Sequence, residues 1–190
     1  MGFGVSNALH ASAAPALAGD FNEWKNGSIV FAAAEAIVAA GSDGRITNNT
    51  IHDVSYMAVG NGGVTTDSST FPPARNEISG NTVSRTGRMG ISLYGDPAVR
   101  VLRNRVSQAM LIIDGGGLIY SPYTKGTGAE IAYNDVSDIA CIYGTGIYLD
   151  DGASGFVVHP NLVRNVSWYG VSLKMPSQFF NSFLGGNRSL

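Results

Sequence analysis

The residues best suited to chemistry are three carboxylates and a lysine in the C-terminal half of the chain. Asp114 precedes three glycines, Asp150 and Asp151 precede Gly152, and Lys174 lies further on. Two carboxyl groups flanking a glycosidic bond can supply the acid and the base that cleave it. Carboxylate oxygens are also preferred ligands of Ca²⁺. We therefore expect Asp114 and Asp150 to be acid and base candidates, with Lys174 beside them; no cofactor is implied, although Ca²⁺ is an alternative.

These residues also have simpler interpretations. An Asp-Gly pair is typical of a turn, in which Asp hydrogen-bonds locally and Gly supplies a positive φ, so Asp151-Gly152 predicts a turn. Lys174 would act as a base only if its pKa were lowered, whereas an ion pair with Asp150 would raise that pKa. A structural ion pair is therefore the alternative to a catalytic lysine.

Tyrosines accompany the charged residues. Tyr94, Tyr120 and Tyr148 each lie in or directly after a short apolar segment that begins with glycine. Aromatic rings beside carboxylate and ammonium groups on a shallow face suit a sugar ligand. We expect these three tyrosines, together with Asp151, to bind the substrate.

A sequence repeat determines where these residues lie. An aliphatic residue, an asparagine three positions later and a second aliphatic residue two positions after that recur five times. The asparagines of the five copies are Asn49, Asn81, Asn104, Asn134 and Asn161. A unit that recurs at intervals of about 20 to 30 residues is typical of a solenoid.

The repeat predicts the corner of a parallel β-helix. Side chains alternate along a strand, so aliphatic residues five positions apart share one face only if the chain bends between them. Asparagine suits that bend because it tolerates the left-handed conformation, and stacked asparagines can form an amide ladder. We expect an all-β solenoid of about six rungs over residues 45–190. A β-sandwich is the alternative, but it would need two-residue Asn-Gly or Asp-Gly hairpin turns.

A second strand is expected after each corner. Gly90–Leu93, Gly146–Leu149 and Gly170–Leu173 follow three of the corners, and Ala58-Val59 is expected to follow the corner at Asn49. If the aliphatic residues of these strands point inward, the outward column contains Tyr94, Asp150 and Lys174. Neighbouring rungs would then bring Asp150 and Lys174 to about 5 Å of each other at Cβ.

The first 44 residues are expected to form an N-terminal segment that holds a degenerate first rung or a cap. Within it, residues 28–40 are rich in alanine, which favours a helix that caps the open end of the solenoid. The same residues include short β-branched runs, and we favour strands here.

Composition excludes several classes of protein. The 190 residues carry a net charge of −2 without a run of either sign, so no surface for nucleic acid or an anionic membrane is indicated. Cys141 is the only cysteine and no apolar run is long enough to span a bilayer. The first basic residue is Lys25, so no clear signal peptide is present. Because the repeat restarts near Asn187 and then stops, we expect the chain to be part of a longer solenoid. The sequence does not indicate the oligomeric state.

The segments Asp114-Gly-Gly-Gly-Leu-Ile-Tyr120 and Gly146-Ile-Tyr-Leu-Asp-Asp-Gly152 resemble those of right-handed parallel β-helix proteins of the pectate-lyase-like superfamily, of the bacterial secreted, glycan-active type. The resemblance implies a right-handed helix, a polysaccharide or oligosaccharide partner and an extracellular or periplasmic location. The chain lacks the Gly-His-Gly and Arg-x-Lys motifs of polygalacturonases and the Trp-x-Asp-His motif of pectate lyases. The resemblance therefore implies carbohydrate processing without a named substrate.

Taken together, these observations predict a polysaccharide-active β-helix domain, either a glycoside hydrolase or a polysaccharide lyase, that binds its glycan along an outward strand face. Two alternatives remain open at this stage. The chain is a non-catalytic glycan-binding or cell-surface structural solenoid, or it is a fragment of a longer enzyme.

Overall fold

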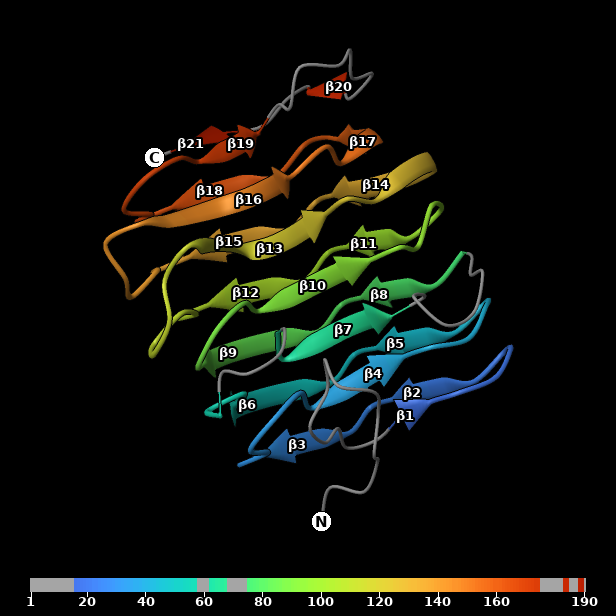
Figure 1. Ribbon diagram of the computed structural model, residues 1–190. Coiled ribbons are helices and arrows are strands. Elements are labelled where there is room, and N and C mark those ends of the chain that lie inside the picture. Colours follow the sequence, from blue (N-terminus) through green and yellow to red (C-terminus); the bar gives the residue numbers. More distant parts are fainter. Residues whose placement is uncertain (1–15, 58–61, 68–74, 175–182, 185–187, 190) are drawn as a thin grey trace.

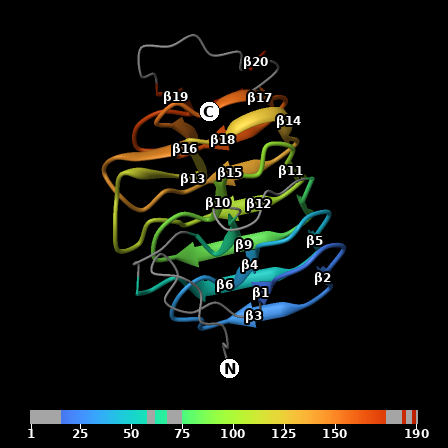
Figure 2. The same ribbon diagram turned by 45° about the vertical axis from the view of Figure 1, so that its right-hand side comes forward.

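The computed structural model describes residues 16–57, 62–67, 75–174, 183–184 and 188–189. In these residues the chain coils into a stack of rungs, with its N-terminal strands at one end and its C-terminal strands at the other (Figure 1). Each rung contributes one strand to each of three sheets, and all strand pairs are parallel. The predicted parallel β-helix is therefore confirmed, and Figure 2 shows the same stack turned to reveal its side.

Seven strands make up each sheet in the described part of the chain. The first sheet contains β1 (Ala16–Leu17), β4 (Ile37–Ala39), β7 (Val64–Asp67), β10 (Ile91–Tyr94), β13 (Gly116–Pro122), β16 (Gly144–Asp150) and β19 (Val171–Leu173). The second contains β2 (Glu23–Lys25), β5 (Arg45–Thr47), β8 (Glu77–Ser79), β11 (Arg100–Leu102), β14 (Lys125–Ala132), β17 (Ser154–Val158) and β20 (Phe183–Leu184). The third contains β3 (Ser28–Val30), β6 (Thr50–Val54), β9 (Thr82–Thr86), β12 (Arg105–Ser107), β15 (Asp135–Ser137), β18 (Leu162–Arg164) and β21 (Arg188–Ser189).

The aliphatic residues of the repeat form the core. Those before the asparagine and those after it are at most 1% exposed in all five copies. They come from the second and third sheets and meet the inward residues of the first sheet, such as Ile91, Ile119 and Ile147, in one continuous cluster. Burial of this column on every rung stabilises the stack, because apolar area removed from water is the dominant favourable contribution to folding.

The asparagines form the predicted amide ladder at the corner between the second and third sheets. In Asn81, the backbone N–H and the side-chain amide both donate to Oδ1 of Asn104, at 3.0 Å each. Its Nδ2 also donates to the carbonyl oxygen of Ile46, at 2.8 Å. The same contacts join each consecutive pair among Asn49, Asn81, Asn104, Asn134 and Asn161. Each asparagine is at most 4% exposed, so the ladder satisfies amide groups that water does not reach.

The left-handed residue of this corner differs from the prediction. The positive φ falls on the residue before the asparagine: Asn48, Gly80, Arg103 and Tyr133 have φ between 56° and 67°. The ladder asparagines themselves do not have a positive φ. Their side chains must point along the stack toward the next rung, and the preceding residue makes the sharp change of direction instead.

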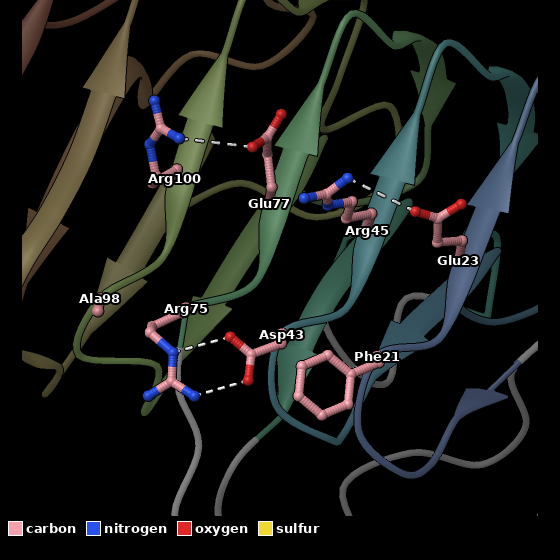
Figure 3. A pocket seen from close by; sticks show the side chains of 8 residues that line it. All are labelled: Phe21, Glu23, Asp43, Arg45, Arg75, Glu77, Ala98 and Arg100. Atoms are coloured by element: carbon pink, nitrogen blue, oxygen red, sulfur yellow. Dashed lines mark hydrogen bonds and ion pairs between the residues drawn. The ribbon is translucent and has the colours of Figure 1, made fainter.

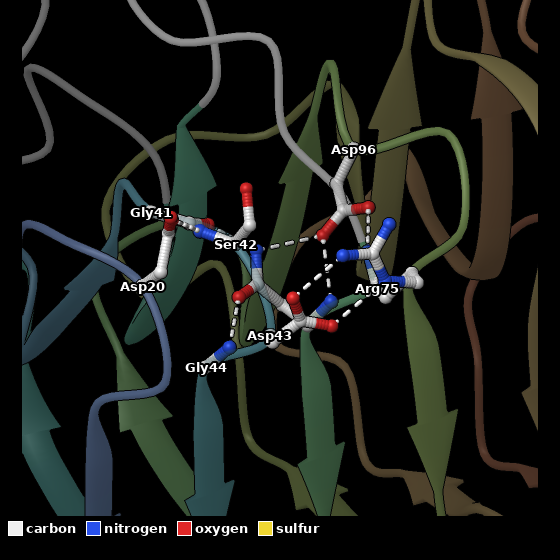
Figure 4. Close-up of polar contacts among 8 residues, drawn as sticks. Asp20, Gly41, Ser42, Asp43, Gly44, Arg75 and Asp96 are labelled. Carbon is white, nitrogen blue, oxygen red and sulfur yellow. Dashed lines mark hydrogen bonds and ion pairs between the residues drawn. The ribbon is translucent and has the colours of Figure 1, made fainter.

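A second polar network holds the corner between the first and second sheets (Figure 4). Oδ1 of Asn76 accepts a hydrogen bond from Gly44 N–H at 2.7 Å, and Nδ2 of Asn76 donates to Asp96 at 2.8 Å. Asp96 is fully buried, and burial raises the pKa of its carboxyl group despite these hydrogen bonds. Polar groups of three successive rungs are thereby fixed at this corner.

Two further expectations concern the placement of strands. The alanine-rich residues 28–40 contain β3 and β4, so the preference for strands over a capping helix is confirmed. Ala58-Val59 lies outside the described residues, whereas Val64–Asp67 forms the strand that pairs with β10. The connection after Asn49 is thus longer than expected from the strands that follow Asn81 and Asn161.

Candidate functional site

The outward face of the first sheet collects most of the predicted site residues. Strand pairing places Tyr120 beside both Ser92 and Tyr148, and it places Pro122 beside Asp150. Tyr148 pairs with Ser172 and Leu149 pairs with Leu173. Asp150 and Lys174 are the next residues along the two strands. The expected proximity of Asp150 and Lys174 is therefore confirmed, and Tyr120 lies in one row with Ser92, Tyr148 and Ser172.

Asp150 lies at the centre of this face. One carboxylate oxygen accepts a hydrogen bond from the Tyr120 hydroxyl at 2.8 Å. The other accepts from the backbone N–H of Asp151 at 2.8 Å and pairs with Nζ of Lys174 at 2.9 Å. Only 6% of Asp150 is exposed, so the carboxylate is nearly enclosed by its partners. Three donors on one buried carboxylate are the arrangement that keeps it ionised.

The electrostatics of the site agree with that geometry. Burial acts to raise the pKa of Asp150, but the hydrogen bonds from Lys174, Tyr120 and Asp151 together outweigh it, so the pKa lies below its usual value. Lys174 also pairs with Asp151 at 2.8 Å. Contacts with Asp151 and Asp150 raise the pKa of Lys174 well above its usual value. Lys174 is therefore a cation, and the neutral amine that a lysine base requires is strongly disfavoured.

The tyrosines of this face pack against one another. The Tyr120 ring lies 5.6 Å from that of Tyr148 in an edge-to-face arrangement and 6.5 Å from that of Tyr94, between ring centroids. Together with Met89 they form a small apolar cluster, and Tyr120 and Tyr148 are each only 8% exposed. A sugar cannot stack on rings so thoroughly covered, so these two tyrosines support Asp150 rather than present an open platform.

Sequence reasoning missed one tyrosine beside the site. Tyr123 lies in the turn between β13 and β14, and 66% of it is exposed. A hydrogen bond to Asp151 raises the pKa of its hydroxyl group. Its position directly after Pro122, which pairs with Asp150, was the signal that could have identified it.

Asp114 does not join this cluster. It is exposed and precedes β13 at the Gly116 end, whereas Asp150 pairs with Pro122 at the other end of that strand. The six residue steps between Gly116 and Pro122 span about 20 Å. This exceeds the roughly 5 to 10 Å that separates paired carboxyl groups in glycosidases. Asp114 therefore cannot act with Asp150 on one glycosidic bond, and we place it outside the site.

The Asp-Gly segment beside Asp150 is a turn, as its composition predicted. Asp151 and Gly152 have positive φ values of 42° and 81°, and Ala153 N–H donates to the Asp150 carbonyl oxygen at 2.9 Å. The turn orients both carboxylates toward Lys174. Within the described residues, no three His, Cys, Asp or Glu side chains gather to hold a metal ion. Calcium binding therefore stays a prediction.

Comparison with known protein families decides the classification. Residues 17–183 match the family model described as "Right handed beta helix region". The chain belongs to the right-handed β-helix family. The predicted handedness is thereby confirmed together with the architecture, and the matched range includes part or all of each of the seven rungs that the described residues form.

A solved structure with the same fold is the A-module of a mannuronan C-5 epimerase from Azotobacter vinelandii. It superimposes with a TM-score of 0.61 at 15% sequence identity, over 94% of this chain and 55% of that chain. The chain thus spans about half the length of that structure, and at this identity the similarity establishes the fold alone. A comparison with curated proteins gives no match.

Across the ranges that the structure describes, no helix is long and apolar enough to cross a bilayer.

Proposed function

We propose that this chain acts on a polysaccharide at the outward face of the first sheet, with Asp150 at the reaction centre. The observation that carries the proposal is a carboxylate that is 6% exposed and ionised on an outward face, with Tyr120 and Lys174 bound to it. Burial of a charged group is costly, and such groups gather at functional sites. The similar epimerase module, a polysaccharide-modifying enzyme by name, supports a polysaccharide as the partner.

Between the two expected reactions, the electrostatics favour the lyase. A glycoside hydrolase needs a protonated carboxyl group with a raised pKa to act as the general acid. The pKa of Asp150 is lowered instead, and Asp151 shares the same cation. A lyase needs an ionised base and a cation that neutralises the carboxylate of an acidic sugar, and Asp150 and Lys174 have those properties.

The roles follow from this chemistry. Lys174 uses two of its three N–H donors on Asp150 and Asp151, and the third would bind the substrate carboxylate. Asp150 would take the proton from the carbon beside that carboxylate. The electron pair would form a carbon–carbon double bond as the glycosidic C–O bond breaks. The departing oxygen would take a proton from the exposed Tyr123 hydroxyl.

A screen of the purified chain on acidic and neutral polysaccharides tests the proposal. The expected result is an unsaturated product from a uronic acid polymer, detected by its ultraviolet absorbance. Reducing ends without unsaturation would indicate a hydrolase, and C-5 inversion without cleavage, detected by NMR, would indicate an epimerase. Either result would refute the lyase assignment. Absence of every product together with retained glycan binding would refute catalysis and favour the non-catalytic alternative.

A further inference from the structure

A pocket of about 410 Å³ lies on the outward face of the second sheet, which is a different face from that of Asp150 (Figure 3). Its volume falls in the range of small-ligand sites, roughly 300 to 1,000 Å³. The residues that line it are Phe21, Glu23, Asp43, Arg45, Arg75, Glu77, Ala98 and Arg100. They come from four successive rungs, so the pocket runs along the stack for about 14 Å.

Strand register builds one row of this pocket. Glu23 pairs with Arg45, Arg45 with Glu77, and Glu77 with Arg100. Opposite charges therefore alternate across neighbouring strands. The register itself is already determined by the asparagine ladder and by the apolar core, so alternating charges are not needed to align the strands.

The ion pairs in that row are loose. The nearest nitrogen–oxygen distances are 3.6 Å for Arg45 and Glu23 and 3.5 Å for Arg100 and Glu77. The arginine side chains are 62% and 51% exposed. Exposed pairs of this kind add little to stability. One oxygen of Glu23 accepts from Lys25 Nζ and one of Glu77 accepts from the Ser79 hydroxyl, at 2.7 Å each. The two glutamate side chains are 36% and 29% exposed, so the arginine N–H groups and the other carboxylate oxygens are the groups that a ligand can reach.

A tighter pair lies at the edge of the pocket next to the corner network. Arg75 donates two hydrogen bonds to Asp43, at 2.7 and 2.6 Å. The backbone around this pair is fixed, because Arg75 N–H donates to Asp96 and Gly44 N–H donates to Asn76 (Figure 4). The pocket therefore has a rigid side that needs no rearrangement on binding, which lowers the cost of ordering a ligand.

Phe21 supplies an aromatic surface at the same edge. Its ring lies beside Asp43 in Figure 3, and 75% of the residue is exposed. An exposed ring that leaves its faces free can stack against the apolar C–H face of a sugar. Sugar hydroxyl groups both donate and accept hydrogen bonds, and the alternating arginines and carboxylates offer both kinds of partner.

We infer that this pocket binds a few consecutive units of an uncharged oligosaccharide. Three carboxylates (Glu23, Asp43 and Glu77) face three guanidinium groups (Arg45, Arg75 and Arg100), so the lining has no net charge and gives no attraction to a polyanion. The site is separate from Asp150 and does not depend on the reaction proposed there. It would hold neutral chains near the enzyme while an acidic polymer is processed on the other face.

Affinity electrophoresis tests this site, with the whole chain run in gels that contain hydroxyethyl cellulose or galactomannan. Titration calorimetry with cellohexaose and mannohexaose measures the binding in solution. We expect retardation by at least one neutral polymer, unchanged by added salt because no ionic attraction is involved. Phe21→Ala removes the stacking ring and should weaken binding by about five- to tenfold. Phe31→Ala is the matched control, because Phe31 is also exposed (78%) with almost the same φ, 61° against 60°.

Several outcomes would overturn the inference. Equal binding of the neutral polymer by the Phe21→Ala and wild-type chains is one, and an equal loss of that binding in the Phe31→Ala control is another. Retardation by sodium polygalacturonate alone, with loss of that retardation at high salt, is a third. Absence of retardation by any probe is the fourth. Asp150→Asn should leave neutral-polymer binding intact, so failure of the reaction proposed at Asp150 and failure of this site are observed separately.

Discussion

Asp150 is a carboxylate that the fold keeps ionised in a nearly buried position. Its partners come from three successive strands of the first sheet or their ends: Tyr120 on β13, the turn after β16, and Lys174 after β19. Such a cluster is stable only while all three partners are present, because an uncompensated buried charge is strongly destabilising. The same residues therefore serve both stability and the proposed chemistry.

The lowered pKa of Asp150 predicts how stability changes in acid. A group whose folded pKa lies below its unfolded value of about 3.9 contributes stability above that pH and loses it as the pH falls through the folded pKa. Asp150→Asn should cost about 1 to 2 kcal/mol in the free energy of unfolding at pH 7. Urea unfolding of both chains should show that difference shrinking as the pH falls from 4 toward 2. A difference that stays constant over this range would show that folding does not lower the pKa of Asp150.

Tyr148 predicts a second pH effect, at the alkaline end. Burial, with Asp150 nearby, raises its pKa to about 12. A raised pKa contributes stability below the unfolded value of about 10, and this is lost as the pH rises through 12. In an absorbance titration, the ionisation present in the wild-type chain and absent from Tyr148→Phe should occur near pH 12. Ionisation of that residue near pH 10 would mean that the ring is exposed.

At the scale of elements, the asparagine ladder determines the corner between the second and third sheets. Asn104 lies in its middle: its side chain donates to Ile78 and Asn134 and accepts from Asn81. Replacement by alanine leaves several buried polar groups without partners, each costing about 1 to 3 kcal/mol.

We therefore expect Asn104→Ala to lower the free energy of unfolding by at least about 3 kcal/mol, measured by urea denaturation. Asn22→Ala is the control, because the Asn22 side chain makes an exposed hydrogen bond to the Gly19 carbonyl oxygen. It should change stability by less than about 0.5 kcal/mol. Equal effects of the two substitutions would show that the ladder does not stabilise the stack.

Sequence patterns predict these elements well where the repeat is regular and less well between repeats. The spacing around each asparagine predicts which aliphatic residues are buried and brings Lys174 to Asp150. The described strand of the first sheet after Asn49 is Val64–Asp67, which a spacing of nine residues does not predict, because loop length between rungs is not encoded in a local pattern. The nearness of Asp114 and Asp150 to tyrosine-containing strands in the sequence predicts a shared site, but the length of β13 separates the two carboxylates.

The pocket on the second sheet was missed although the repeat contains its signal. The position four residues before the ladder asparagine holds Arg45, Glu77, Arg100 and Glu130 in turn, which is an alternation of charge visible in the sequence. Burial of the tyrosines, in contrast, could not be predicted from the sequence. It depends on the packing of rings from adjacent strands against one another, as for Tyr120 and Tyr148.

For the whole molecule, the stack presents two faces with different chemistry on a single core. The first sheet carries an ionised carboxylate with its lysine, and the second carries a row of balanced charges beside an exposed ring. Because each rung contacts mainly its neighbours, a solenoid can vary one face without disturbing another. The two proposed sites are therefore expected to respond independently to substitution.

We propose that Asp150, and not Asp114, is the base that acts on an acidic polysaccharide. Turnover of the uronic acid polymer that gives an unsaturated product should be measured for the wild-type chain, Asp150→Asn and Asp114→Asn, each checked for folding by circular dichroism. We expect Asp150→Asn to lower the rate by at least about 100-fold, the usual contribution of a general base. Asp114→Asn should retain the wild-type rate. Full activity of a folded Asp150→Asn chain, or loss of activity in Asp114→Asn, would show that Asp150 is not the base.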